Sequence, residues 1–163
     1  MATFVHLTSE KNLKSILRNG ITRLTRRGNG GVGVYASPVT KNYYASHQWL
    51  RELKRRNAGP IVAIYFRIPD ETLVFVGRYN QDHQPMTAAQ AVATMMQCEY
   101  LAGYEVIIPR KIAQDEIRRY RTVSQVVGWR YYPEAHGQKP CGCPYCQRGE
   151  YGARKLRERY ERE

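Results

Sequence analysis

The sequence predicts a single domain with an α+β fold, and three observations support this. Short runs of β-branched and aromatic residues, of which residues 61–68 are the clearest, are typical of strands. Apolar residues at helical spacing occur in only a few separate segments. Strands and helices do not alternate regularly, so a parallel βαβ sheet is not expected. With 163 residues, 42% of them apolar, the chain can bury one core of ordinary size.

The first third of the chain predicts two strands, two helices and a loop. In chain order these are a strand at residues 3–7, a capped helix at 8–20, a glycine-rich loop at 22–33, a second strand at 34–37 and a second helix at 41–57. The hydroxyl of Thr8 or Ser9 can cap the first helix, and Gly20 can end it. The loop is basic and rich in glycine, so we expect it to be mobile.

The middle of the chain predicts further strands and one well-marked helix. The expected elements are a turn at residues 59–60, a strand at 61–68, an extended segment at 72–76, a polar loop at 80–85, a helix at 88–97 and a strand at 104–108. Thr87 can cap the helix. Residues 112–127 mix the alternation that is typical of strands with the spacing that is typical of helices, and they predict neither element clearly.

The composition changes at residue 131, where proline, glycine and cysteine become frequent. We therefore divide the chain into a folded domain at 1–130 and a small, cysteine-rich, basic C-terminal extension at 131–163. A charged helix is expected from about residue 151 to the end of the chain.

The extension holds three thiols within six positions, those of Cys141, Cys143 and Cys146. Cysteines at this spacing, with proline and glycine beside them, are typical of a zinc knuckle. Zinc takes four ligands, and His136 or Cys98 could supply the fourth. Such a zinc would be structural. The alternative is three reduced thiols in a turn, and a disulfide scaffold is not expected without an export signal.

The charge is strongly positive and unevenly spread. The formal net charge is +12, and residues 1–60 hold 11 Lys and Arg against two acidic residues. Such a basic half suits a polyanion, which could be nucleic acid, an acidic protein or a phosphate-rich cofactor, although a solubilising surface explains the charge equally well. Thirteen tyrosines mixed with basic residues would suit base stacking.

The sequence predicts a soluble, cytoplasmic protein with no membrane partner. It contains no run of eighteen apolar residues, which a membrane-spanning helix needs. Its N-terminal segment carries an early helix signal rather than the unbroken apolar run of a signal peptide.

Three residues are the strongest candidates for chemistry: His6, Tyr35 and Glu105. Each lies in or at the end of a predicted strand, and strands hold side chains firmly enough for a preorganised site. Each also has a simpler interpretation, because a histidine in a first strand can be a hydrogen-bonded core residue, a tyrosine can be packed in a sheet, and a glutamate can face solvent at an edge.

The order and surroundings of these residues favour the functional interpretation. Thr8 follows His6 after one residue, residues 31–35 read Gly-Val-Gly-Val-Tyr, and Glu105 opens an apolar strand. Over residues 4–117 the chain resembles the ADP-ribosyltransferase superfamily, specifically the His-Tyr-Glu branch that includes diphtheria toxin and the poly(ADP-ribose) polymerases. The resemblance implies an ADP-ribosyltransferase-like split β-sandwich with flanking helices.

The resemblance also implies that NAD is the substrate that donates ADP-ribose. The implied NAD-binding residues are His6, Leu7, Thr8, Tyr35, Tyr43, Tyr44, Arg23 and Arg27. His6 would hydrogen-bond the adenosine-side ribose, and the backbone of Leu7 would pair with the carboxamide. Tyr35 and either Tyr44 or Tyr43 would sandwich the nicotinamide ring. Arginines of the glycine-rich loop would hold the pyrophosphate.

The resemblance gives Glu105 the central catalytic part. Glu105 would bind the 2′-hydroxyl of the nicotinamide ribose, stabilise the positive charge that develops as the C1′–N bond breaks, and act as general base on the acceptor. Two positions depart from the pattern of the family. Leu7 stands where glycine is usual, so its side chain has to point away from NAD. Gly103 stands where the arginine-modifying branch needs glutamate, so modification of protein arginines is disfavoured.

Residues 8–20, which read Thr-x-x-x-Asn-Leu-x-x-Ile-Leu-x-x-Gly, are also similar to the opening of small bacterial ADP-ribosyltransferase toxins that modify nucleic acid. This implies a nucleic-acid acceptor, with RNA favoured over DNA, and a toxin of a toxin–antitoxin or phage-defence system with an antitoxin partner. The arginines expected to contact nucleic acid are Arg26, Arg55, Arg56, Arg148 and Arg154. The alternatives are an ADP-ribosyltransferase that modifies protein and a non-catalytic zinc-knuckle module that binds nucleic acid.

Overall fold

The computed structural model describes residues 1–26, 31–41, 43–56, 59–79 and 81–124, and it does not describe the side chains of residues 43, 44, 55 and 56. The predicted extension at 131–163 lies outside the described residues. The described part has the α+β fold that the sequence predicts, and its strand pairs are antiparallel.

Eight strands form one hydrogen-bonded sheet in the described part of the chain. They are β1 (Ala2–Ser9), β2 (Thr25–Arg26), β3 (Val32–Pro38), β4 (Ile61–Ile68), β5 (Leu73–Arg78), β6 (Gln84–Thr87), β7 (Tyr104–Ile108) and β8 (Ile117–Thr122). The order across the sheet is β6-β5-β7-β3-β1-β4-β8, and β2 pairs with β3. The two predicted strands that carry His6 and Tyr35 are therefore neighbours in the middle of the sheet.

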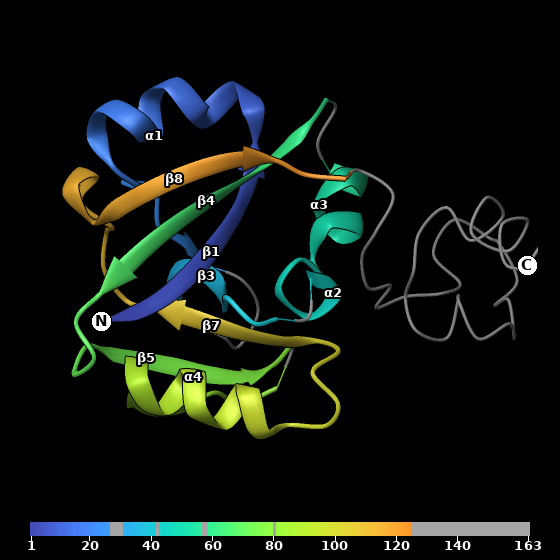
Figure 1. Ribbon diagram of the computed structural model, residues 1–163, viewed down its shortest axis with the longest axis vertical. Helices are drawn as coiled ribbons and strands as arrows, with labels where there is room; N and C mark the ends of the chain where they lie inside the picture. The colour runs from blue at the N-terminus through green and yellow to red at the C-terminus, as the bar shows by residue number, and fades with distance from the viewer. Residues whose placement is uncertain (27–30, 42, 57–58, 80, 125–163) are drawn as a thin grey trace, which may run out of the picture.

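Four short α-helices accompany the sheet in the described residues. They are α1 (Leu13–Asn19), α2 (Tyr43–Ser46), α3 (Leu50–Arg56) and α4 (Ala88–Gln97). In Figure 1, α4 runs along β5 at one end of the molecule, and α1 lies at the other end beside β8. None of the helices described is long and apolar enough to cross a bilayer.

The sheet opens between β1 and β3. β1 pairs with β4 along its whole length. It pairs with β3 only where Phe4 faces Pro38 and Val5 faces Ser37. Beyond these two positions the sheet continues as two parts, with β1, β4 and β8 in one and β3, β7, β5 and β6 in the other (Figure 1).

Two apolar clusters cover the two faces of β1 and β4. Strand alternation places Phe4 and Phe66 on one face, with ring centroids 6.0 Å apart, and it places Val5 and Tyr65 on the other. The first cluster includes residues of α1 and α4, and the second includes Leu50 of α3. Because both faces are covered, β4 is apolar at nearly every position, which is why this strand is the clearest in the sequence.

The helix at 88–97 and its cap are confirmed. The hydroxyl of Thr87 accepts a hydrogen bond from the backbone N–H of Gln90 at 3.2 Å. The side chain of Gln90 accepts one from the backbone N–H of Thr87 at 2.9 Å. This reciprocal capping box depends on local sequence alone; the sequence analysis predicts the cap at Thr87, and the returning bond from Gln90 is found in the structure.

The predicted cap of the first helix is wrong. Thr8 and Ser9 belong to β1, because pairing with β4 keeps the chain extended as far as Ser9. The hydroxyl of Thr8 instead accepts a hydrogen bond from the side-chain amide of Asn12 at 3.0 Å. α1 has no side-chain cap, and it ends at Gly20, with φ 77°, as predicted.

The predicted helix at 41–57 is also wrong as a single element, since a turn at residues 47–49 divides it into α2 and α3. The hydroxyl of Ser46 donates to the carbonyl oxygen of Pro38 at 3.1 Å, and His47 Nε2 lies 3.2 Å from the hydroxyl of Tyr65. Gln48 bonds to the turn before β7. These tertiary hydrogen bonds fix the side chains where the two helices separate.

The basic glycine-rich segment at 22–33 contains more regular structure than predicted. β2 pairs with the first residues of β3 on either side of residues 27–30, which lie outside the described residues. Gly33 lies within β3, where a Cβ would come within 2.4 Å of the carbonyl oxygen of Ile108 in β7. This glycine therefore allows two strands to pack closely, and it does not mark a loop.

Two segments without a clear pattern also contain strands. The predicted polar loop at 80–85 leads into β6, which pairs with β5. The mixed segment at 112–127 contains β8, which pairs with β4 at the edge of the sheet. Most residues of β8 are exposed, so this strand lacks the apolar alternation by which strands are recognised.

Candidate active site

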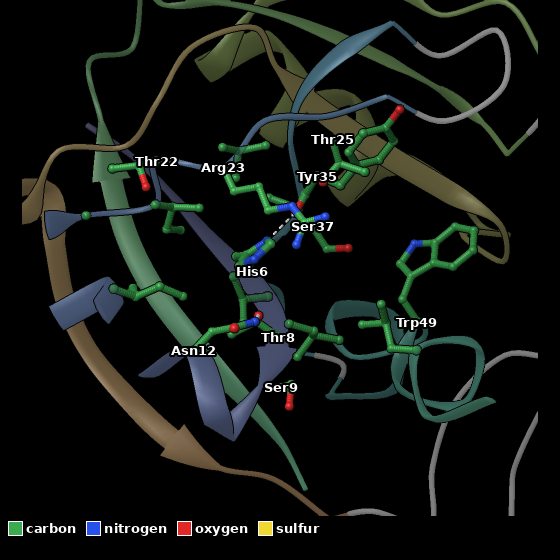
Figure 2. A pocket seen from close by; sticks show the side chains of 18 of the residues that line it. His6, Thr8, Ser9, Asn12, Thr22, Arg23, Thr25, Tyr35, Ser37 and Trp49 are labelled. Carbon is green, nitrogen blue, oxygen red and sulfur yellow. Dashed lines mark hydrogen bonds between the residues drawn. The ribbon is translucent and has the colours of Figure 1, made fainter. Parts of the chain in front are cut away.

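A pocket of about 500 Å³ lies where β1 and β3 separate (Figure 2). It is lined by Val5, His6, Leu7, Thr8, Ser9, Asn12, Ser15, Ile16, Gly20, Ile21, Thr22, Arg23, Thr25, Val34, Tyr35, Ala36, Ser37, Trp49, Leu53 and Glu105. The structure thus brings His6, Tyr35 and Glu105 together from three strands. Pockets of about 300–1,000 Å³ are typical of small-molecule and cofactor sites.

His6 bridges the two strands at the point where their pairing ends. Its Nδ1 lies 2.8 Å from the carbonyl oxygen of Tyr35. A carbonyl oxygen can only accept, so Nδ1 carries the proton, and Nε2 of the neutral ring is an acceptor. Figure 2 shows His6 in the middle of the lining, with Arg23 and Tyr35 on one side and Thr8 and Asn12 on the other.

Two aromatic side chains from different elements line the pocket. Tyr35 is half-buried on β3, and its hydroxyl donates to the carbonyl oxygen of Gly31 at 3.1 Å. Trp49 lies in the turn before α3, and its indole N–H donates to the carbonyl oxygen of Tyr104 at 3.1 Å. The rings of Trp49 and Tyr79 are 5.5 Å apart between centroids. These contacts hold both aromatic walls before any ligand binds.

Glu105 is the second residue of β7 and is only 5% exposed. Its Oε1 lies 3.3 Å from His83 Nε2, and both side chains are buried. This distance is short enough for an ion pair. Among the described residues, however, His83 Nε2 has no hydrogen-bond partner with suitable geometry. Burial lowers the pKa of His83, although the carbonyl of Gln81 and the carboxylate of Asp82 act in the opposite direction.

The side chain of Gln48 holds the turn in front of Glu105. Its Oε1 accepts a hydrogen bond from the backbone N–H of Gly103 at 2.7 Å, and its Nε2 donates to the carbonyl oxygens of Leu101 and Tyr104 at 3.0 and 3.4 Å. Gly103 has φ 81°, a conformation that favours glycine. A buried amide and a glycine thereby fix the start of β7, on which Glu105 stands.

Arg23 and Glu105 are the charged side chains among the described residues that line the pocket. Arg23 lies in the segment between α1 and β2 and is exposed. Its guanidinium can pair with an anion such as a phosphate. The lining therefore combines a cation, a carboxylate, an imidazole and two aromatic rings, which is a suitable set for a charged, partly aromatic ligand.

The other predicted NAD-binding residues divide into three groups. Thr8 and Leu7 both line the pocket, and strand alternation directs the side chain of Leu7 to the face opposite His6, where it joins the second apolar cluster. Tyr43 and Tyr44 lie in α2, but their side chains are not among those described. Arg27 lies outside the described residues.

The predicted nucleic-acid arginines lie away from the pocket lining or are not described. Arg26 is exposed on β2 and does not line the pocket. Arg55 and Arg56 lie at the end of α3, and their side chains are not described. Arg148 and Arg154 lie outside the described residues.

Two residues of the site are missing from the sequence prediction, His83 and Trp49. His83 lies in an aperiodic polar segment, and the fact that it is one of only four histidines in the chain is the one signal that marks it. Trp49 lies in a segment that reads as continuous helix, so nothing in the sequence points to the turn that directs it to the pocket.

Comparison of the chain with protein-family models, with curated proteins and with solved structures finds no match.

Within the described ranges up to residue 124, no group of three or more His, Cys, Asp or Glu side chains could hold a metal ion. Cys98 donates its thiol hydrogen to the carbonyl oxygen of Tyr100 at 3.4 Å. The other predicted zinc ligands, His136, Cys141, Cys143 and Cys146, lie outside the described residues, so zinc stays a prediction.

Proposed function

We propose that this chain is an NAD-dependent ADP-ribosyltransferase that modifies nucleic acid, with RNA as the acceptor. One observation carries the proposal: His6, Tyr35 and Glu105 come from three strands to a single pocket of a size typical of cofactor sites. The opening of the sheet between β1 and β3 also supports the split β-sandwich that the sequence resemblance implies.

The pocket offers a suitable partner for each part of NAD. The flat, positively charged nicotinamide fits against aromatic faces, which Tyr35 and Trp49 supply. Trp49 is thus a further candidate for the second stacking place, which the resemblance gives to Tyr44 or Tyr43. Arg23 can neutralise the pyrophosphate, and His6 offers an acceptor nitrogen to a ribose hydroxyl.

Glu105 would supply most of the rate enhancement. The bond between C1′ and the nicotinamide nitrogen breaks through an oxocarbenium-like state, in which positive charge grows on the ribose. A fixed, buried carboxylate stabilises this state more than it stabilises bound NAD, because the charge is largest in the transition state. Glu105 is 5% exposed, so little water screens it.

An exposed basic strand supports a polyanionic acceptor. β8 lies at the edge of the sheet and presents Arg118, Arg119 and Arg121 to solvent, together with Tyr120, which is 49% exposed. The guanidinium of Arg119 lies 4.8 Å from the ring centroid of Tyr65. Arginines bind phosphates, and exposed rings stack on the unpaired bases that single-stranded RNA offers.

We test the function by incubating the purified protein with labelled NAD and separate RNA, DNA and protein fractions of a bacterial lysate. We expect label in RNA, and none with the Glu105→Gln variant, which keeps the shape of the side chain but not its charge. Label in the protein fraction alone would contradict the RNA acceptor. If the wild-type protein neither transferred label nor bound NAD, the result would contradict an enzymatic function. A non-catalytic nucleic-acid-binding module would then be the better account.

We also propose that the activity makes the protein a toxin with an antitoxin partner, because modified RNA would stop growth. Expression of the wild-type chain in a bacterial host should arrest growth, and expression of the Glu105→Gln variant at the same level should not. Equal growth of the two strains would contradict a toxic role. Growth arrest by both the wild-type chain and Glu105→Gln would show that the toxicity does not depend on Glu105.

A further inference from the structure

The contact between His83 and Glu105 is unusual because both atoms that face each other are acceptors when the pair holds no proton. His83 Nδ1 lies 2.9 Å from the carbonyl oxygen of Gln81, which can only accept, so the proton of the neutral ring is on Nδ1. Nε2 then presents a lone pair. It lies 3.3 Å from Oε1 of Glu105, which in the ionised carboxylate also has only lone pairs.

One added proton would turn this repulsive contact into a charge-assisted hydrogen bond. The proton would lie between His83 Nε2 and Glu105 Oε1, in a place where both side chains are buried and water competes little. Burial is the largest influence on the pKa of His83 and lowers it, whereas the carboxylates of Asp82 and Glu105, the charged groups at His83 among the described residues, favour a positive ring. The pair is therefore expected to titrate as a unit, with values that belong to neither residue alone.

The sheet makes room for this contact with a glycine. Gly77 of β5 lies opposite Glu105 of β7 in the register of the two strands. A Cβ at Gly77 would lie 2.9 Å from Cγ of His83 and 2.8 Å from the carbonyl oxygen of Asp82. Any larger residue at position 77 would thus displace the segment that carries His83, so the ring can lie beside the carboxylate because this position has no side chain.

We propose that His83 and Glu105 form a dyad that takes up the proton released by the ADP-ribose acceptor during transfer. His83 is a positioning residue in this proposal, because it acts on the reaction through Glu105. The inference rests on the proposed function, since without transfer from NAD no acceptor proton is released.

The step balances in atoms and charge. The acceptor hydroxyl or amine forms its bond to C1′ as the bond between C1′ and the nicotinamide nitrogen breaks, and the electron pair of that bond neutralises the nicotinamide. The proton of the acceptor passes to Glu105 and is shared with His83 Nε2. It then leaves to solvent, which restores the unprotonated dyad. At a pH low enough for the dyad to hold a proton before the reaction, Glu105 cannot accept the proton of the acceptor. Transfer should therefore slow at low pH.

The first test needs no activity. In protein with ¹⁵N-labelled histidine, the Nε2 resonance of His83 is followed against pH, in the wild-type chain and in Glu105→Gln. We expect Nδ1 to stay protonated in both, and the Nε2 titration to move to lower pH in the variant, because the carboxylate that attracts the proton is gone. The same midpoint in both proteins would overturn the dyad.

The second test uses the rate of NAD cleavage against pH. In His83→Gln, an amide N–H can donate to Glu105 but the side chain cannot take up a proton. We expect kcat to fall by about 10- to 100-fold with KM for NAD little changed, and the acid limb of the profile to move to lower pH. A kcat, KM and acid limb equal to those of the wild type would overturn the proposal.

Two further variants separate the dyad from its surroundings. Gly77→Ala should reproduce the loss of kcat, because its Cβ displaces His83 although neither residue of the dyad is substituted. Gln81→Ala should keep the wild-type profile, because Gln81 holds His83 through its backbone carbonyl. Absence of NAD cleavage in the wild-type chain would overturn the proposed function and with it the source of the proton, whereas an unshifted Nε2 midpoint would overturn the dyad alone.

Discussion

The two halves of β1 differ in what lies beside them. In the first half, β4 pairs on one side and β3 on the other, at Phe4 and Val5, and the carbonyl oxygen of Thr3 accepts a further bond from the backbone N–H of Val39 at 3.1 Å. In the second half, from His6 to the end of the strand, pairing with β4 continues and the pocket lies where β3 would be. The first half of the strand thus serves as core, although Val5 at its end also lines the pocket, and the second half serves as pocket wall.

The comparison shows how a sheet can create a site without an additional domain. Phe4 in the first half is fully buried, whereas His6 and Thr8 in the second half are half-buried and polar. Where the backbone ladder to β3 stops, the His6 side chain makes the next bond to that strand, at the carbonyl oxygen of Tyr35. We therefore expect changes in the first half to affect stability and changes around the second half to affect NAD chemistry.

The largest effect is expected on the pocket side, for Glu105→Gln. Removing the charge that faces the developing oxocarbenium should lower the rate of nicotinamide release by about 10³-fold or more, equivalent to about 4 kcal/mol of transition-state stabilisation. NAD affinity should change little, because the charge acts mainly in the transition state. The measurement is a single-turnover rate together with calorimetric NAD binding. A rate within about threefold of the wild type would contradict the role of Glu105.

The next largest effect is expected in the first half of β1, for Phe4→Ala. Phe4 is fully buried against Phe66, so its truncation should lower the free energy of unfolding by about 3–5 kcal/mol, as measured by urea denaturation. The NAD affinity of the protein that remains folded should not change. Tyr120→Ala is the matched control, because its ring is 49% exposed and should contribute less than about 0.5 kcal/mol. Loss of NAD affinity without loss of stability in Phe4→Ala would contradict the comparison.

His6 lies at the boundary of the two halves, and its substitution should affect both properties moderately. His6→Ala leaves the carbonyl oxygen of Tyr35 without its side-chain donor, at a cost of about 1–2 kcal/mol in stability. NAD affinity should fall by about tenfold, the value of one lost hydrogen bond. His6→Asn supplies a donor near the place of Nδ1 and should recover part of the stability but not the affinity. Equal affinities for the wild-type and alanine proteins would remove His6 from the NAD site.

The smallest effect is expected outside β1, at the ion pair of Arg110 and Glu116. The two side chains make two hydrogen bonds, of 2.8 and 2.6 Å, and the bonds from Arg110 lower the pKa of Glu116. The folded-state pKa lies below the unfolded one, so the pair stabilises the fold above the ordinary glutamate value and loses this contribution as pH falls through the lowered value. Glu116→Gln should cost about 1 kcal/mol or less at neutral pH, because the pair is partly exposed.

Unfolding free energies of wild type and Glu116→Gln, measured from neutral pH into acid, check this sign. The difference between the two proteins should shrink as the pH falls. A difference that stays constant with pH would show that the pair contributes through packing and not through charge.

Local signals in the sequence predict much of the fold. The helix at 88–97 could be predicted because Thr87 and Gln90 cap it with bonds that need no tertiary partner. β4 could be predicted because both of its faces are buried and it is apolar at nearly every position. Of the candidate site, the sequence predicts the three strand residues, His6, Tyr35 and Glu105, which the structure places in one pocket, while their roles stay predictions.

What the sequence could not predict depends on contacts between distant segments. The predicted helix at 41–57 is divided at a turn, where the amide of Gln48 bonds to Gly103, far along the chain. His83 lies beside Glu105 because Gly77 leaves space between two paired strands. Neither pairing has a spacing or period by which one sequence could reveal it.

The central claim is that His6, Tyr35 and Glu105 surround one molecule of NAD, and magnetisation transfer between NAD and the protein tests it most directly. In a complex of NAD with the Glu105→Gln variant, which should bind NAD without cleaving it, the nicotinamide ring protons should show nuclear Overhauser effects to the ring of Tyr35. The ribose protons on the adenosine side should show them to His6. Effects from NAD to residues of β8 and none to Tyr35 or His6 would contradict the account.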